Sequence, residues 1–425
     1  MSLSPAVRIL LALVVGLAAG AAAAGSGAAW LDGANAVAAT VGGLWLDALK
    51  MTVVPLIVAL LVSGINGGVH AANAGGVAGR SALWFAGIIM TSAVLGALLM
   101  PLLLQVAPLP RAAADALRAG LGAVDIKATA AAVPTASEFL RQAVPTNVIA
   151  AAANDKILQL VLFTSVFAFA LTRIDPGPRE RLAGYFDAIA AAMLVMIGWV
   201  LWLAPLGVLG LAFTVGASAG SAAFGAILHY IVLVSSLGGL IIIAAYGVAL
   251  FGARLPPGRF ARAMIAPQAV AISTQSSLAS LPAMLAASKA LGIAEHKADV
   301  TLPLAVALFR ATGPAMNIAV AIYVAHLMGV ELGPLQLAAG VAVAATTTLG
   351  AVSLPGQLSF VTSIAPIALA MGIPIEPLAL LIAVETIPDI IRTLGNVTMD
   401  VAVTGAAARG KARDQRPEIS LTESE

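Results

Sequence analysis

Charged side chains are scarce in this sequence. They make up only 10% of the 425 residues, whereas 60% of the residues are hydrophobic. Soluble domains carry about 25% charged residues. A chain this poor in charge cannot cover its surface with groups that bind water, so most of that surface must face lipid or other protein. The composition excludes an ordinary soluble protein and indicates an all-α integral membrane protein.

Cysteine is absent, and histidine is rare. The lack of cysteine excludes thiol chemistry and leaves the redox compartment unread. The histidines lie far apart and show no metal-binding spacing, and no nucleophile elbow is present. A net charge of only +2 gives no reason to expect a nucleic-acid partner. We therefore expect a protein that is not an enzyme and that needs no cofactor.

Long apolar segments fill most of the chain. Two of them, 264–293 and 335–372, are interrupted by polar residues, proline and glycine. Irregular backbone at membrane depth is tolerated only inside protein or beside water. We therefore predict two re-entrant helical hairpins there, and eight membrane-spanning helices elsewhere, the first a retained helix and not a cleaved signal peptide. The spans are expected at 7–24, 44–67, 81–107, 157–172, 188–217, 224–252, 298–330 and 375–404.

Basic residues and a short repeat give the orientation and the symmetry. Most arginines and lysines fall in connections that this topology places on one side, so both termini are expected in the cytoplasm. The polar connection 108–145 is then outside, although it contains basic residues as well. Ser280-Leu281-Pro282 and Ser353-Leu354-Pro355 are each followed by Gly-Ile and then by an arginine within an apolar segment. Such corresponding interrupted segments indicate an internal repeat and a transporter site.

The last predicted span carries a polar stripe. At about 100° per residue, its members fall within an arc of roughly 100°. Each charge would cost about 2.5–3.5 kcal/mol if it faced lipid at the centre of the membrane. The stripe must therefore face the protein interior or a wet cavity, where it either packs as a salt-bridge network or binds a substrate. Its members are Glu385, Asp389, Arg392, Thr393, Asn396 and Asp400.

Small hydroxyl residues gather at the first interruption. Such a cluster either stabilises the packing of membrane helices or forms a hairpin tip, whose free backbone N–H groups can bind a carboxylate. Its position immediately before Leu281-Pro282 favours the tip. The cluster contains Ser273, Thr274, Gln275, Ser276, Ser277 and Ser280.

These motifs resemble those of the dicarboxylate/amino acid:cation symporters, the glutamate transporter family. The segment 276–282 is similar to the serine motif of that family's first hairpin, and 389–400 to its last-helix binding motif. Leu354-Pro355-Gly356 resembles the second-hairpin tip, and segments 50–56 and 145–147 resemble scaffold motifs. The resemblance implies inverted repeats, which are known from an archaeal member of that family. It also implies a homotrimer in which a transport domain moves like an elevator against a scaffold.

Domain boundaries follow from the resemblance as well. The scaffold would comprise 1–80 and 146–223, and the transport domain 81–107, 224–255 and the core 256–404. The remaining parts would be the extracellular connection 108–145 and a disordered cytoplasmic tail, 405–425.

The resemblance further implies residue roles. Asp389 would bind the substrate amino group, and Arg392, supported by Glu385, the distal carboxylate. Thr393 and Asn396 would complete the polar contacts. The remaining ligands, for the α-carboxylate, would come from the two hairpin tips: Ser276, Ser277, Ser353 and Gly356.

One departure from the family pattern concerns sodium. Where the family's seventh span has an unwound Asn-Met-Asp-Gly-Thr that helps to bind sodium, this sequence has 309–313, Phe-Arg-Ala-Thr-Gly. Other candidate ion ligands remain: Thr91 and Ser92, and a residual sodium site at Asn396 and Asp400. Arg310 has three readings: a snorkelling side chain, a substrate ligand, or a fixed cation that pairs with Asp400 and replaces the coupling ion.

We therefore expect a secondary active transporter of acidic amino acids or related dicarboxylates in the inner membrane, with altered or absent sodium coupling. Its partners would be a small anionic substrate, lipid and two further copies of the chain. The coupling cation would be Na⁺ or H⁺. The alternatives are a proton-coupled C4-dicarboxylate carrier that uses Glu385 or Asp400, or an anion channel, since arginine-lined pores pass anions.

Overall fold

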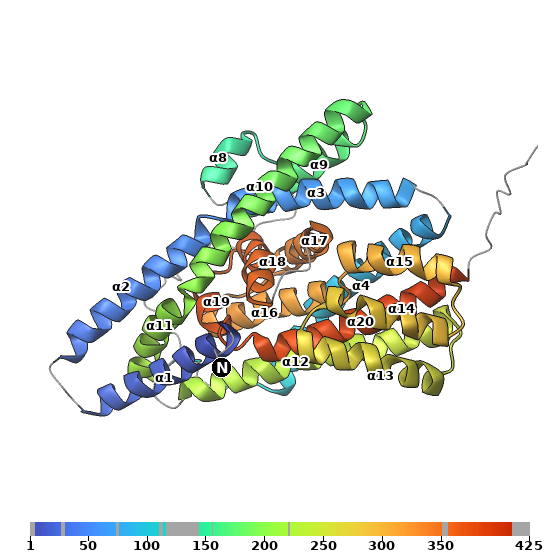
Figure 1. Cartoon of the computed structure of the whole chain (residues 1–425). Coiled ribbons are helices and arrows are strands. Elements are labelled where there is room, and N and C mark those ends of the chain that lie inside the picture. The colour runs from blue at the N-terminus through green and yellow to red at the C-terminus, as the bar shows by residue number, and fades with distance from the viewer. Residues whose placement is uncertain are drawn as a thin grey trace, which may run out of the picture.

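The computed structural model describes residues 5–26, 30–73, 76–109, 114–115, 144–154, 156–219, 222–350 and 356–409. Within these ranges the regular structure is helical and contains no strand (Figure 1). The predicted all-helical class is confirmed. Most of the predicted connection 108–145, the tip 351–355 of the second predicted hairpin and the tail beyond residue 409 lie outside the described residues.

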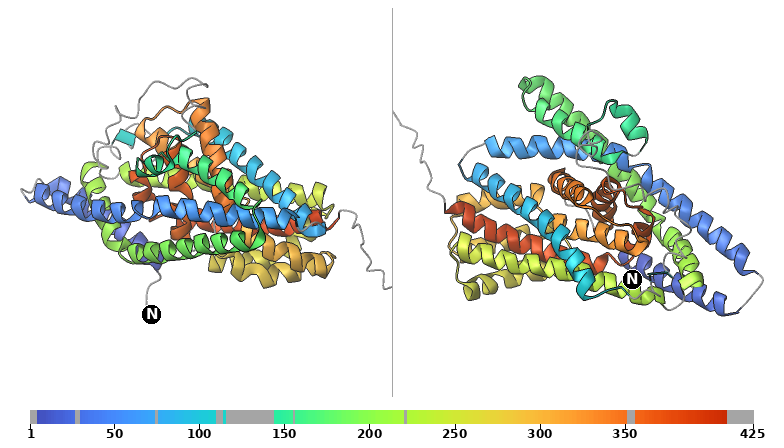
Figure 2. Two further views of the ribbon diagram at one scale, coloured as in Figure 1. Left: turned by 90° about the horizontal axis from the view of Figure 1, so that it is seen from above. Right: turned by 180° about the vertical axis from the view of Figure 1, so that it is seen from behind.

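One group of helices comes mainly from the N-terminal half, and Figure 2 places its long members α2, α3 and α10 at the outside of the molecule. Glycines allow α1 and α11 to pack closely: a Cβ at Gly20 would lie 2.1 Å from the Phe213 carbonyl oxygen, and one at Gly216 would lie 2.2 Å from that of Leu17. Small residues are what membrane helices use for such close approach. The group consists of α1 (Pro5–Ser26), α2 (Leu31–Lys50), α3 (Val53–Asn73), α8 (Val148–Ala153), α9 (Ile157–Leu171), α10 (Pro176–Trp202) and α11 (Ala204–Ala219).

A second group packs around the C-terminal helix. In Figure 1 its helices α12, α13, α14 and α20 run side by side, and α20 contacts α12, α13, α14, α15 and α4. Its members are α4 (Gly76–Val106), α12 (Ala222–Gly247), η1 (Val248–Gly252), α13 (Pro257–Thr274), α14 (Ser277–Ala290), α15 (Glu295–Leu308), α16 (Gly313–Met328), α17 (Pro334–Gly350), α18 (Gly356–Ala370), α19 (Glu376–Leu381) and α20 (Thr386–Ala408).

Several predicted segments are divided in the structure. The predicted span 44–67 combines the end of α2 with α3, because the chain turns at 51–52, and 188–217 is split at Leu203 between α10 and α11. The first hairpin segment turns at 275–276, where Gln275 has a positive φ of 52°, whereas Pro282 lies inside α14. Hydropathy could not locate the turns at 51–52 and at Leu203, since apolar residues continue on both sides of them, whereas polar residues mark the turn at 275–276.

Two further breaks interrupt predicted spans at the centre of the second group. Residues 309–312 separate α15 from α16, and residues 382–385 separate α19 from α20. Pro388 lies in the first turn of α20. A proline there removes a backbone N–H that has no helical partner in any case. The helical segment is therefore interrupted before Pro388 and not at it.

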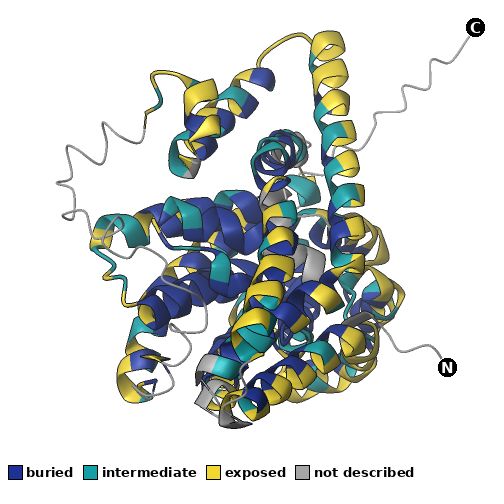
Figure 3. Ribbon diagram, turned by 90° about the vertical axis from the view of Figure 1, so that its left-hand side faces the viewer, coloured by how far each residue is buried: buried dark blue, intermediate teal, exposed yellow. Residues whose placement is uncertain are grey.

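The surface of the molecule suits a membrane. Six helical stretches in the described part of the chain are long and apolar enough to cross a bilayer. Figure 3 shows buried positions where the helices meet and exposed positions on their outward faces. Large apolar side chains are among the exposed ones, including Leu83 at 73% and Trp199 at 68%. So many exposed large apolar side chains indicate contact with lipid or with another protein.

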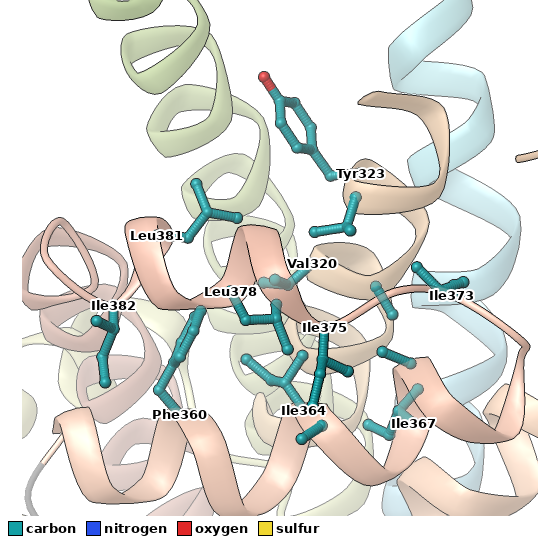
Figure 4. Close-up of a cluster of buried hydrophobic side chains, with 14 of the residues drawn as sticks. Val320, Tyr323, Phe360, Ile364, Ile367, Ile373, Ile375, Leu378, Leu381 and Ile382 are labelled. Atoms are coloured by element: carbon teal, nitrogen blue, oxygen red, sulfur yellow. The ribbon is translucent and has the colours of Figure 1, made fainter. Parts of the chain in front are cut away.

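The centre of the second group is a dry apolar core. Figure 4 shows Phe360 and Ile364 from α18 facing Leu378 from α19, with Val320 of α16 beside them. All four side chains are buried. This core holds α19 and α16 together, and so fixes the start of α20 relative to the break after α15.

Candidate substrate and ion site

Thr312 joins the broken segment 309–312 to the last helix. Its backbone N–H donates to Asn396 Oδ1 at 3.0 Å. Its hydroxyl lies 2.7 Å from the same Oδ1 and 2.8 Å from the Arg392 carbonyl oxygen, and it donates to one of them at a time. These bonds satisfy backbone and side-chain groups that the broken helix leaves free. The break at 309–312 is therefore a stabilised part of the fold.

Gly395 permits this close approach. A Cβ at residue 395 would lie 2.3 Å from Thr312 Cγ2, closer than any real contact. We expect Gly395→Ala to displace Thr312 from Asn396 and to destabilise the protein by about 1–3 kcal/mol, as overpacking does. Thermal unfolding in detergent would measure the loss. Gly87→Ala is the matched control, because nothing lies within 4 Å of its Cβ position; equal melting temperatures for the two variants would contradict the prediction.

Ser92 holds the other side of the break. Its hydroxyl donates to the Ala311 carbonyl oxygen at 2.5 Å and accepts from the Ala315 backbone N–H at 3.2 Å. Thr91, the neighbouring candidate ion ligand, is exposed on α4 and donates to the Gly87 carbonyl oxygen of its own helix at 2.8 Å. The structure therefore brings Ser92 to the site and leaves Thr91 outside it.

Arg392 is the centre of a buried charge cluster. Its Nη1 donates to Glu385 Oε1 and, at 3.0 Å, to Asp389 Oδ1. Glu385 precedes the first residue of α20, and its Oε2 accepts from the Tyr230 hydroxyl at 3.2 Å. The Nε and Nη2 atoms of Arg392 are buried and have no hydrogen-bond partner among the described residues. The guanidinium thus binds Glu385 and Asp389 through Nη1 alone, and its Nε–Nη2 edge is available.

Asp400 and Arg310 complete the ionisable groups. Both carboxylate oxygens of Asp400 are buried, and neither accepts a hydrogen bond within the described ranges. Arg310 is partly exposed, and it interacts electrostatically with Asp389, Asp400 and Arg392. No hydrogen bond joins Arg310 to Asp400, since neither oxygen of that carboxylate has a hydrogen-bond partner in the described part of the chain. The pairing of the two charges that the sequence suggested stays a prediction.

Ser276 and Ser277 lie at the turn between α13 and α14, and this helix pair packs along the side of the last helix, α20. Ser276 caps α14 by accepting from the Ala279 backbone N–H at 3.2 Å, and Ser277 is the first residue of that helix. The pair α13–α14 packs along α20, where Gln268 donates to the Thr398 hydroxyl at 3.0 Å. Thr393 is buried on α20. The two second-hairpin candidates differ: Gly356 begins α18, and Ser353 lies outside the described residues.

Two residues of the candidate site were not identified from the sequence. Tyr230 reaches Glu385 from α12, which is about 150 residues away along the chain. Thr312 was within the aligned segment but was not recognised as the ligand of Asn396. The available signals were a tyrosine within an apolar helix and a hydroxyl residue beside a helix break, because each needs a hydrogen-bond partner when it is buried.

Comparison with known proteins gives the family. The chain is 27% identical to the neutral amino acid transporter B(0) of Oryctolagus cuniculus, over 98% of this chain and 82% of that protein. It is 28% identical to the proton/glutamate-aspartate symporter of Escherichia coli (82% and 79% covered). It is 25% identical to the C4-dicarboxylate transport protein of Laribacter hongkongensis (85% and 81%). The sodium:dicarboxylate symporter family matches residues 6–409, and the chain belongs to that family.

Proposed function

We propose that this protein is a secondary active transporter of acidic amino acids, and that a proton takes the place of sodium as its coupling ion. The family and the relatives support a transporter of amino acids or dicarboxylates. The choice among acidic, neutral and C4 substrates depends on the charge cluster around Arg392.

The available edge of Arg392 carries the substrate assignment. Nε and Nη2 form one edge of the guanidinium, the geometry that holds a carboxylate through two parallel hydrogen bonds. A neutral side chain offers no such pair of acceptors, so it would leave buried donors unsatisfied. Asp389 is the complementary partner for a substrate ammonium group, and two carboxylates without an amino group would repel it. An amino acid with a distal carboxylate matches both groups.

The charges in the site favour a coupling cation. Three carboxylates (Glu385, Asp389, Asp400) and two guanidinium groups (Arg310, Arg392) leave one net negative charge when all are ionised. Aspartate or glutamate adds another. An uncompensated charge in a site with little water costs free energy. A cation that enters with the substrate would therefore favour binding.

Several oxygen atoms that could bind sodium are already engaged. Asn396 Oδ1 accepts from Thr312, and Ser92 bonds to the backbone of 311 and 315. Phe309 and Ala311 offer no side-chain oxygen, whereas sodium prefers oxygen ligands. A proton needs no such shell, and either Glu385 or Asp400 can carry it. This supports coupling to protons.

The packing is compatible with an elevator. The helices α1–α3 and α9–α11 pack mainly on one another, and α4, α12–α16 and α20 pack around the site. We assign these groups to the scaffold and transport domains that the resemblance implies; α17 and α18 contact both groups. We propose that the second group carries the substrate across the inner membrane within a homotrimer whose chain termini are cytoplasmic.

Transport by the purified protein in liposomes tests this function. We expect labelled aspartate uptake to follow an inward proton gradient and to be unaffected when sodium is replaced by choline. Succinate and a neutral amino acid serve as competitors that separate the three substrate classes. A tenfold or larger rise in aspartate affinity on adding sodium would contradict the coupling, and stronger competition by succinate than by glutamate would contradict the substrate.

A further inference from the structure

The residue that holds Glu385 lies outside the substrate stripe. Tyr230, on α12, is completely buried, and its hydroxyl donates to Glu385 Oε2 at 3.2 Å. Glu385 in turn binds Arg392 through its other oxygen. We propose that Tyr230 is a positioning residue for substrate selectivity, which fixes the Glu385 carboxylate and thereby the direction in which Arg392 presents its Nε–Nη2 edge. This inference depends on the proposed role of Arg392 as the ligand of the distal carboxylate.

Glu385 needs such a support because of its place in the chain. It lies in the break 382–385, where the helical hydrogen bonds that would fix it are interrupted. Its carboxylate is completely buried, and an acceptor without donors there is costly. Arg392 and Tyr230 supply one donor to each of its oxygens. Without the tyrosine hydroxyl, the carboxylate can rotate and take the guanidinium with it.

Tyr230 is itself held by a neighbouring aromatic pair. Its ring meets Tyr323 of α16 edge-to-face, with ring centroids 5.3 Å apart. The Tyr323 hydroxyl donates to the Ala226 carbonyl oxygen at 2.9 Å and lies 3.2 Å from His229 Nδ1. Figure 4 shows that hydroxyl directed away from the apolar cluster. His229 Nε2 lies 2.8 Å from the Ala107 carbonyl oxygen.

The two tyrosines therefore differ in one respect. Both are buried, and their rings pack on each other, but only Tyr230 has a hydroxyl bonded to a group that touches Arg392. The charged groups that act on Tyr230 are Glu385 and Arg392. Tyr323→Phe is thus a matched control: it removes one buried hydroxyl from the same ring pair and leaves Glu385 untouched.

The test compares aspartate with asparagine, which has nearly the same shape but no distal carboxylate. Affinities of the full-length protein for both are measured by calorimetry in wild type, Tyr230→Phe and Tyr323→Phe. We expect Tyr230→Phe to lower the aspartate-to-asparagine affinity ratio about tenfold, in the range of one hydrogen bond to a charged group. Tyr323→Phe should leave the ratio unchanged. A general loss of structure would weaken both ligands alike and leave the ratio constant.

A second variant makes the result independent of how well Tyr230→Phe folds. Glu385→Gln should lower the same ratio, and adding Tyr230→Phe to it should change the ratio little further, because the tyrosine acts through that carboxylate. Additive effects, or an unchanged ratio in Tyr230→Phe, would overturn the inference while leaving the transport function intact. If the wild-type protein binds no aspartate, the proposed function fails, and this inference fails with it.

Discussion

Replacing Arg392 by cysteine should abolish the preference for acidic substrates. Loss of one partner of a buried, hydrogen-bonded charge pair costs about 2–5 kcal/mol, which corresponds to roughly 30-fold or more in affinity. The physical reason lies on both sides of the guanidinium. The substrate loses its bidentate partner, and Glu385 and Asp389 lose the cation that neutralises both of them. Binding of labelled aspartate to the purified variant would measure the effect.

Two comparisons separate recognition from damage. Arg392→Lys keeps the charge but not the planar fork, so it should recover folding more fully than aspartate affinity. A neutral amino acid should bind Arg392→Cys at least as well as it binds the wild type, since no donors are then left unsatisfied. Unchanged aspartate affinity in Arg392→Cys would mean that the distal carboxylate binds elsewhere, with Arg310 the remaining cation in the described site.

The sequence was sufficient for those parts of the site that lie on one helix. The stripe from Glu385 to Asp400 could be recognised because helical geometry places its members on one face, and the structure buries the charged members together. The two interrupted segments were also recognisable, since polar residues and proline do not suit a lipid-facing helix. The turn at 275–276 and the helix starting at Gly356 lie within those segments.

The parts that escaped prediction depend on contacts between distant segments. No periodicity connects Tyr230 with Glu385, or Ser92 with the backbone at Ala311. The resemblance to family motifs also did not indicate how two candidate ion ligands are bonded. Ser92 and Asn396 match candidate ion ligands by position, but their oxygen atoms bond to the broken segment. A match by position in a motif therefore does not show whether an oxygen atom is available to an ion.

Arg310 should be needed for substrate binding with or without sodium. It interacts with the charges of Asp389 and Asp400 and lies in the segment 309–312. Arg310→Met would raise the net negative charge of the empty site from one to two. Because the arginine is partly exposed and makes no hydrogen bond to Asp400, we expect a loss of about tenfold in aspartate affinity and not the larger loss typical of a buried pair. Calorimetry in sodium and in choline buffer should give the same loss.

Restoring sodium dependence should require more than the removal of Arg310. A cation about 4 Å from sodium costs about 4 kcal/mol at an effective dielectric of 20, so Arg310→Met is necessary. Asparagine at 309 and aspartate at 311 would supply the missing oxygen atoms. Asn396 would nevertheless remain bonded to Thr312. We therefore expect the triple variant Phe309→Asn, Arg310→Met, Ala311→Asp to bind aspartate equally in sodium and choline.

Adding Thr312→Gly should leave Asn396 Oδ1 with one donor, the backbone N–H of residue 312, and open its other acceptor position to an ion, since glycine has no hydroxyl to donate. Glycine also matches the residue that the family pattern has at this point. The unpaired carboxylate of Asp400 then lies one helical turn further along α20, so two oxygen ligands would become available together. The quadruple variant should therefore gain at least about tenfold in aspartate affinity when choline is replaced by sodium, a free-energy difference of about 1.4 kcal/mol. Sodium dependence already present in the triple variant would show that the Thr312–Asn396 bond does not exclude the ion. Its absence in both variants would place the block elsewhere, with Ser92 the next candidate because its hydroxyl remains bonded to the backbone at 311.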